Sequence, residues 1–152
     1  MKKIGQLTFH ASHNYGSVLQ AYALSRELQL LGFQTEFINL RPESQRQAYK
    51  IIRESDRGIH RFFRILIYPF LSKRAKEYER FINKVLPTTL KEYKSTEELK
   101  KEVFDYDMYV CGGDQIWNPI CQDFETAYYL QFLDDKNKVR KISYSPSFGR
   151  TE

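Results

Sequence analysis

The sequence has few of the residues and runs that mark several large classes of protein. Its 152 residues include only two cysteines, Cys111 and Cys121, and their positions fit neither a disulfide framework nor a zinc site. No apolar run approaches the roughly 20 residues that span a bilayer. The N-terminal MKKIGQLTFH starts with basic residues, but its apolar run is too short for a signal peptide. These absences predict a cytoplasmic protein with free thiols.

Signatures of the common cofactors and of nucleic-acid binding are also missing. The dinucleotide pattern GxGxxG does not occur, and a strand candidate ends in Asn39-Leu40-Arg41 instead of a ribose-binding acid, which argues against NAD. His10 and His13 have no third ligand beside them, so no metal is expected. We find no reader motif and no basic segment interleaved with stacking aromatics, so no nucleic-acid partner is expected.

The chain does have enough apolar material for one sizeable core, and an excess of positive charge. Hydrophobic residues make up 41% and aromatic residues 15% of the sequence, which excludes a disordered chain. Lys and Arg total 24 against 19 Asp and Glu, and the net charge of +5 favours anionic partners in general. Phosphate esters, carboxylates and anionic lipid surfaces all stay open on this ground.

Apolar patterns predict an α/β fold. A strand over 3–9, a helix over 18–31 and a strand over 35–40 form a βαβ unit with a right-handed crossover. The apolar face of the helix is predicted to consist of Ala21, Leu24, Leu28 and Leu31. Gly32 is expected to end the helix.

Further elements follow closer to the C-terminus. A capping box at Ser95 and Glu98 starts a short helix that leads into a buried strand over 108–111, and 141–145 is another strand candidate. Residues 1–152 are therefore predicted to form one Rossmann-like domain, an open parallel sheet flanked by helices. A doubly wound sheet would continue with a helix after 141–145, so the predicted layer is unfinished there.

Residues 42–94 are predicted to form a mainly helical excursion within this domain. The polar residues 41–58 are expected to be mostly irregular. A basic amphipathic helix should follow, and then a second helix over 72–85. The first helix has two interpretations: packing on the sheet or a neighbouring domain, or contact of Ile59 to Leu71 with an anionic membrane at the inner face. Packing is favoured because most such helices face a core.

The stretch Tyr106–Pro119, YDMYVCGGDQIWNP, is the centre of the sequence. A short apolar run stops at a glycine pair, which is typical of a buried strand that opens into a loop. Ligands bind at such strand ends in open α/β sheets. The alternative is a structural loop in which Asp114 and Asn118 cap backbone groups while Trp117 fills a gap. The residues alone leave both interpretations open.

Two other loops carry polar groups at predicted strand ends. In HASHNYGS, Asn14 and Gly16 tolerate unusual backbone angles and Ser17 is predicted to cap the following helix. Free backbone N–H groups there would suit an anion or a sugar. The third loop, Ser147-Phe148-Gly149-Arg150, follows Pro146, which interrupts the strand before it.

These three segments together resemble the polysaccharide pyruvyl transferase family. FHASHNYGSVLQAYAL, YDMYVCGGDQIWNP and KISYSPSFG occur in the family's order and approximate spacing, over nearly the whole chain. The resemblance implies the N-terminal half of a two-domain fold of the glycosyltransferase-B type. It also implies that a C-terminal domain, in cis or in trans, is a partner.

The family implies transfer of a pyruvyl ketal group from phosphoenolpyruvate to two sugar hydroxyls, on a sugar or lipid-linked glycan acceptor of the cell surface, without a cofactor. Asp114 is the candidate catalytic residue. Tyr15 or Trp117 is expected to stack on a sugar ring, and Asp114 or Asn118 to bind hydroxyls. The candidate substrate-binding residues are Asn14, Tyr15, Gly16, Ser17, Gln20, Gly112, Gly113, Gln115, Trp117, Asn118, Ser147, Phe148, Gly149 and Arg150.

The chain departs from the family pattern in two places, Gly113 where a serine is expected and Ser145-Pro146 where small residues are expected. Basic residues for the donor are expected mostly in the other domain, with Arg41 and Arg150 as local candidates. We therefore expect no turnover by this chain alone. Two other functions stay open: a nucleotide-sugar-dependent glycosyltransferase domain, and a non-catalytic remnant or module that binds a glycan or partner.

Overall fold

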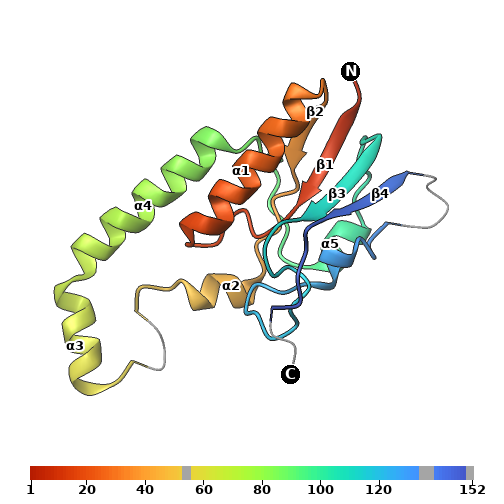
Figure 1. Ribbon diagram of the computed structural model, residues 1–152. Helices are drawn as coiled ribbons and strands as arrows, with labels where there is room; N and C mark the ends of the chain where they lie inside the picture. Colours follow the sequence, from red (N-terminus) through yellow and green to blue (C-terminus); the bar gives the residue numbers. More distant parts are fainter. Residues whose placement is uncertain (53–55, 134–138, 150–152) are drawn as a thin grey trace.

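The computed structural model describes residues 1–52, 56–133 and 139–149. Within these residues the centre is an open, all-parallel sheet in the order β2-β1-β3-β4 (Figure 1). The strands are β1 (Lys3–Leu7), β2 (Gln34–Phe37), β3 (Met108–Gly112) and β4 (Arg140–Tyr144). Helices lie on both sides of the sheet. The predicted Rossmann-like α/β class is confirmed.

Helix α1 (Tyr15–Leu30) begins three residues before the predicted start at 18. Its N-cap is Asn14, whose side chain accepts a hydrogen bond from the Gly16 N–H at 2.9 Å, so the prediction that Ser17 caps the helix was wrong. The helix ends at Leu30 with Leu31 as its C-cap, and the predicted Gly32 follows with a φ of +88°, which suits glycine. Of the predicted apolar face only Ala21 is buried, and the leucines are not. The buried residues of the helix are Ser17, Val18, Ala21 and Ser25.

Three helices follow β2: α2 (Glu43–Ala48), α3 (Gly58–Leu66) and α4 (Tyr68–Val85). Helix α2 lies where irregular chain was predicted. The break between α3 and α4 falls at Ile67 rather than after Phe70, because Pro69 fits only the first turn of a new helix. None of the described side chains of α3 is buried. Packing of this helix on the sheet is therefore wrong, whereas its packing on a neighbouring domain, the other form of that prediction, stays a prediction.

Helix α5 (Thr96–Lys100) begins at the predicted cap, where the Ser95 hydroxyl accepts from the Glu98 N–H at 3.4 Å. It packs near a short 3₁₀ helix, η1 (Thr126–Tyr129), which lies in the connection from β3 to β4. Together they cover the face of the sheet opposite α1.

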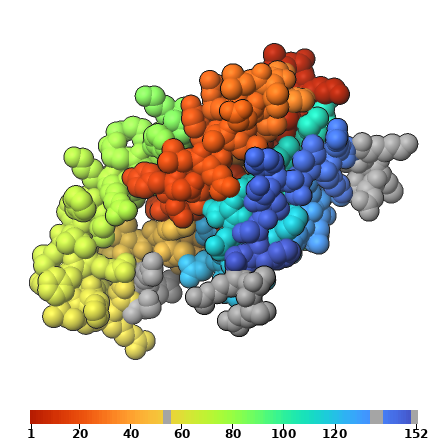
Figure 2. Space-filling model, viewed as in Figure 1, coloured from red at the N-terminus to blue at the C-terminus, as the bar shows by residue number. Residues whose placement is uncertain are grey.

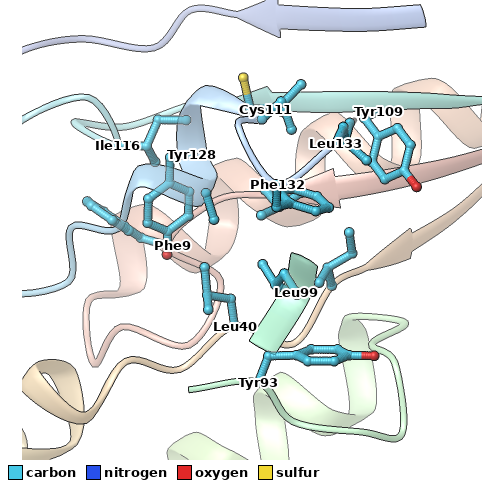
Figure 3. Close-up of a cluster of buried hydrophobic side chains, with 14 residues drawn as sticks. Phe9, Leu40, Tyr93, Leu99, Tyr109, Cys111, Ile116, Tyr128, Phe132 and Leu133 are labelled. Atoms are coloured by element: carbon cyan, nitrogen blue, oxygen red, sulfur yellow. The ribbon is translucent and has the colours of Figure 1, made fainter. Parts of the chain in front are cut away.

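The core has two parts, one on each face of the sheet. The larger part brings Leu7 and Cys111 of the strands against Leu99 of α5 and the fully buried Tyr128 of η1 (Figure 3). The smaller part lies under α1 and α4 and consists of Val18, Ala21, Phe37, Tyr78, Ile82 and Leu86. The strands thus fix the positions of every loop at their carboxyl ends.

Candidate functional site

The candidate site lies where β1 and β3 run side by side. Strand β2, which follows β1 in the sequence, pairs with one edge of β1, and β3 pairs with the other edge. The loops after β1 and β3 therefore leave in opposite directions, which opens a crevice at the carboxyl ends of the two strands. The Thr8 hydroxyl donates to the carbonyl of Gly113 at 3.4 Å across this point.

The first and central loops meet in this crevice. Ser17 is buried in the first turn of α1, and its hydroxyl donates a hydrogen bond to a carboxylate oxygen of Asp114. Gln20 covers Gly113 so closely that a Cβ there would lie 3.0 Å from the Gln20 Cδ. The structure thus brings predicted residues from segments far apart in the chain into contact.

Asp114 is held in a defined orientation. Its backbone φ is +70°, a left-handed conformation that aspartate adopts more readily than most residues. Its Oδ1 accepts from the Gln115 N–H at 2.8 Å, while Oδ2 accepts from Ser17. Each oxygen keeps a second lone pair, so this carboxylate is able to accept a hydrogen bond from a ligand hydroxyl.

A cavity of about 290 Å³ opens beside Asp114. Of the predicted residues, Asn14, Ser17, Asp114 and Gln115 line it. The remainder of its wall comes from residues that sequence reasoning did not select: Phe9, Ser12, Tyr49, Cys121, Gln122 and Asp123. Phe9 and Ser12 belong to the first motif, although they were not selected from it. Tyr49 and the segment 121–123 lie outside all three motifs.

Tyr49 and Asp123 form a second polar pair in the cavity wall. The Tyr49 hydroxyl donates to Oδ2 of Asp123 at 3.2 Å. Burial raises the pKa of the Asp123 carboxyl and, together with the carboxylate beside it, the pKa of the Tyr49 phenol. Burial likewise raises the pKa of the Cys121 thiol, so this side chain is a poor nucleophile at neutral pH.

The third loop interlocks with the central loop. The Ser147 N–H donates to the Asp114 carbonyl at 3.0 Å, and the Trp117 N–H donates to the Ser147 carbonyl at 3.3 Å. Gly149 has a φ of +80° and lies so close that a Cβ would be 2.5 Å from Nδ2 of Asn118. Arg150, the predicted local cation, lies outside the described residues.

Some predicted residues lie apart from the cavity wall. The indole N–H of Trp117 donates to the Tyr128 carbonyl at 3.1 Å, and its ring packs against Tyr129 and Phe148. Asn118 donates to Gln115 Oε1 at 3.2 Å and so holds its own loop. The gap-filling and capping alternative thus describes the observed contacts of these two side chains.

Tyr15 also lies outside the lining of this cavity. Its ring is 55% exposed and packs 4.6 Å from the ring of Tyr78 on α4. Gly112 lies against the backbone of β4, where a Cβ would meet the Tyr144 carbonyl oxygen at 2.0 Å. The geometry therefore gives Gly112 a structural reason to be glycine.

Arg41, the other predicted cation, is engaged by a carboxylate. Its Nη1 lies 3.0 and 2.9 Å from the two carboxylate oxygens of Glu79, and its Nε donates to Asn39 at 3.0 Å. His13, 3.6 Å from Glu79 and stacked on Tyr49 at 4.6 Å, completes this cluster. Hydrogen bonding from His13, supported by Arg41, lowers the pKa of the Glu79 carboxyl.

The two loop histidines do not converge. The His10 Nε2 lies 3.1 Å from the side-chain oxygen of Asn39, whereas His13 faces Glu79. Among the residues that the structure describes, no group of three or more His, Cys, Asp or Glu side chains is arranged to hold a metal ion.

Comparisons with known proteins agree with the geometry at the family level. A family model described as polysaccharide pyruvyl transferase matches residues 14–152, a span that contains all three loops. No curated protein and no solved structure gives a significant match. Because the family model covers far more than half of the sequence, the chain belongs to the polysaccharide pyruvyl transferase family.

Proposed function

We propose that this chain provides the acceptor half of a pyruvyl transferase that forms a ketal on a sugar from phosphoenolpyruvate. Two hydroxyl oxygens of the sugar bond to C2 of the enolpyruvyl group, and the C2–O bond to phosphate breaks. One hydroxyl proton is matched by the proton gained at the methylene carbon, which becomes a methyl group, and the other leaves with inorganic phosphate. Family membership supports this reaction class.

The observation that carries the proposal is the fixed carboxylate of Asp114 in the wall of the cavity. Ser17 and the Gln115 N–H occupy one lone pair on each oxygen, and the residue lines the cavity, so the second lone pairs are available to a ligand there. A carboxylate placed in this way is suited to accept a proton from a sugar hydroxyl as the hydroxyl attacks. Asn14 and Gln115 would bind neighbouring hydroxyls.

The donor's phosphate and carboxylate need cations, and the described lining of this cavity contains neither Lys nor Arg. Arg41, the nearest candidate from the sequence, is already paired with Glu79. We therefore infer that a second domain, in cis or in trans, supplies the donor site. The reaction would take place in the cytoplasm, on a precursor of a capsule or other exopolysaccharide.

The experiment combines binding with turnover. Trp117 is the only tryptophan in the sequence and lies in the central loop, so its fluorescence reports on this loop. Titration with oligosaccharides should change the fluorescence, whereas phosphoenolpyruvate alone should not. Addition of the C-terminal domain of a family member should then give a product heavier by one pyruvate less one water, with one phosphate released per ketal.

Three outcomes would argue against the proposal. Ketal formation by the 152-residue chain alone would contradict the need for a second domain. Consumption of a nucleotide sugar instead of phosphoenolpyruvate would favour a glycosyltransferase. Sugar binding without turnover, even with the second domain present, would favour a non-catalytic binding module.

A further inference from the structure

Helix α3 and the start of α4 expose a continuous apolar face. Phe62 is 59% exposed, Leu66 58% and Phe70 71%. The face, called here the α3 apolar face, consists of Ile59, Phe62, Phe63, Leu66, Ile67 and Phe70, which recur at helical spacing. It occupies the end of the molecule away from the sheet, the yellow region of Figure 2. Large exposed apolar patches of this kind mark interaction sites.

The charges around this face are mainly positive. The segment 57–76 contains no Asp or Glu, and its Lys and Arg residues are Arg57, Arg61, Arg64, Lys73, Arg74 and Lys76. Among these, Arg64 pairs with Asp56 at 3.2 Å, while Arg57, Arg61, Lys73 and Arg74 are exposed. A bulky apolar face bordered mainly by cations matches the composition of helices that lie in the interface of an anionic bilayer.

We propose that the α3 apolar face docks on an anionic phospholipid bilayer, with its aromatic side chains between the headgroups and its arginines and lysines against the lipid phosphates. Each basic residue near such a surface contributes about 1 kcal/mol. Among the described helices none is both long enough and apolar enough to cross a bilayer, so the segment lies in the surface. A second copy of this chain is disfavoured as the partner of the α3 apolar face, because the cations of the two copies would repel each other.

The position of α3 determines which edge of the sheet would face the membrane. Figure 1 shows α3 beyond the carboxyl ends of the strands, the edge at which the candidate site lies. A cavity of about 190 Å³, lined by Arg64, Arg74, His13 and Tyr49 among others, separates α3 from that site. Tyr49 also lines the Asp114 cavity. If the proposed function holds, docking would present the site to a lipid-linked glycan.

The test is co-sedimentation of the chain with vesicles of phosphatidylcholine alone and with added phosphatidylglycerol. We expect the chain to bind the anionic vesicles at least about tenfold more strongly than the neutral ones. Added salt should weaken the binding to the anionic vesicles. The variants Phe62→Ser plus Phe70→Ser and Arg57→Glu plus Arg61→Glu should each lose the binding. All four side chains are exposed, so the fold should survive, as circular dichroism would check.

Matched controls remove apolar or basic side chains from surfaces outside the α3 apolar face. Leu30→Ser plus Leu31→Ser, and Lys2→Glu plus Lys101→Glu, alter equally exposed side chains and should bind as the wild type does. Equal loss in the controls, or no binding by the wild type, would overturn the proposal. Self-association through Phe62 and Phe70 without vesicle binding would also overturn it. None of these measurements uses phosphoenolpyruvate or a sugar, so failure here leaves the proposed transferase function untouched.

Discussion

The hydroxyl of Ser17 donates to the carboxylate of Asp114, a residue 97 positions later in the sequence. This single bond joins the start of α1 to the loop after β3, and so connects the carboxyl ends of β1 and β3. It also fixes the orientation of the one carboxylate to which we assign chemistry. Its two partners can be changed separately, which makes the assignment testable.

Asp114→Asn keeps a residue that tolerates a positive φ, but removes the negative charge. If the proposed function holds, kcat of the chain assayed with the second domain should fall about 100-fold or more, as for loss of a general base. The free energy of unfolding should fall by only about 1 kcal/mol, the range of one hydrogen bond. Rates come from phosphate release and stability from urea titration.

Ser17→Ala is the companion variant, since it removes only the bond that orients the carboxylate. A smaller loss of kcat than in Asp114→Asn is expected. Unchanged acceptor binding and turnover in Asp114→Asn would remove Asp114 from the active role.

Gly112→Ala should disrupt the pairing of β3 with β4. The added Cβ would lie 2.0 Å from the carbonyl oxygen of Tyr144, a backbone atom that can move only if the strands separate. We expect a loss of about 3 kcal/mol or more, or failure to fold. Gly16→Ala in α1 is the control and should cost far less, since its Cβ approaches only a side-chain oxygen, that of Asn14, at 3.2 Å. Equal stability of the two variants in urea would contradict the close approach.

Gly113→Ser restores the residue that the family pattern leads one to expect, yet it should destabilise this chain. Gly113 has a φ of +67°, and its Cβ position is 3.0 Å from the Gln20 side chain. A left-handed serine costs about 1–2 kcal/mol. Gly113→Asn, which tolerates this φ better, should cost less. If serine proved as stable as glycine in thermal unfolding, the left-handed conformation at this position would be wrong.

His10 should make the protein less stable in mild acid. Complete burial is the main reason that its pKa falls from 6.5 to about 4. The unfolded chain therefore binds more protons than the folded one between these values, and stability is lost as pH falls through this window. The expected loss from His10 between pH 7.5 and 5 is about 2 kcal/mol.

The variant His10→Gln isolates this contribution from those of Asp123 and Glu79. Its amide is able to donate to the Asn39 oxygen that His10 contacts, yet it does not titrate. The difference in unfolding free energy between the two proteins should narrow from pH 7.5 to pH 5. A difference that stays constant would show that His10 is not kept neutral by burial.

The strands follow from local patterns, because an apolar run such as 108–111 that stops at a glycine is typical of a buried strand. Their order in the sheet was not predicted, since it depends on contacts between distant segments. The caps at Gly32 and Ser95 are also local features of the sequence. Helix α2 escaped prediction because its only buried residue is the polar Gln45, so it has no apolar stripe. Asn14 and Ser17 are both residue types that cap helices, so the sequence alone did not decide that Asn14 caps α1.

The candidate site could be predicted only in part. Ser17 and Asp114 belong to motifs that end strands, and neighbouring parallel strands bring such loops together. Tyr49 and Asp123 reach the same cavity through tertiary packing that no short pattern encodes. Likewise, the spacing of the α3 apolar face predicts a helix with one apolar side, but spacing does not indicate what covers that side.

The contacts of the central loop also determine when the site forms. Thr8 and Gly113 are 105 positions apart, and the Ser147 N–H reaches the Asp114 carbonyl from beyond β4. Closing such long loops is slow and comes after local helices have formed. A folding chain with only β1, α1 and β2 in place therefore has no binding site. A ligand that binds only the assembled loops contacts residues that follow separate strands, so by mass action it should raise the unfolding free energy of the entire sheet.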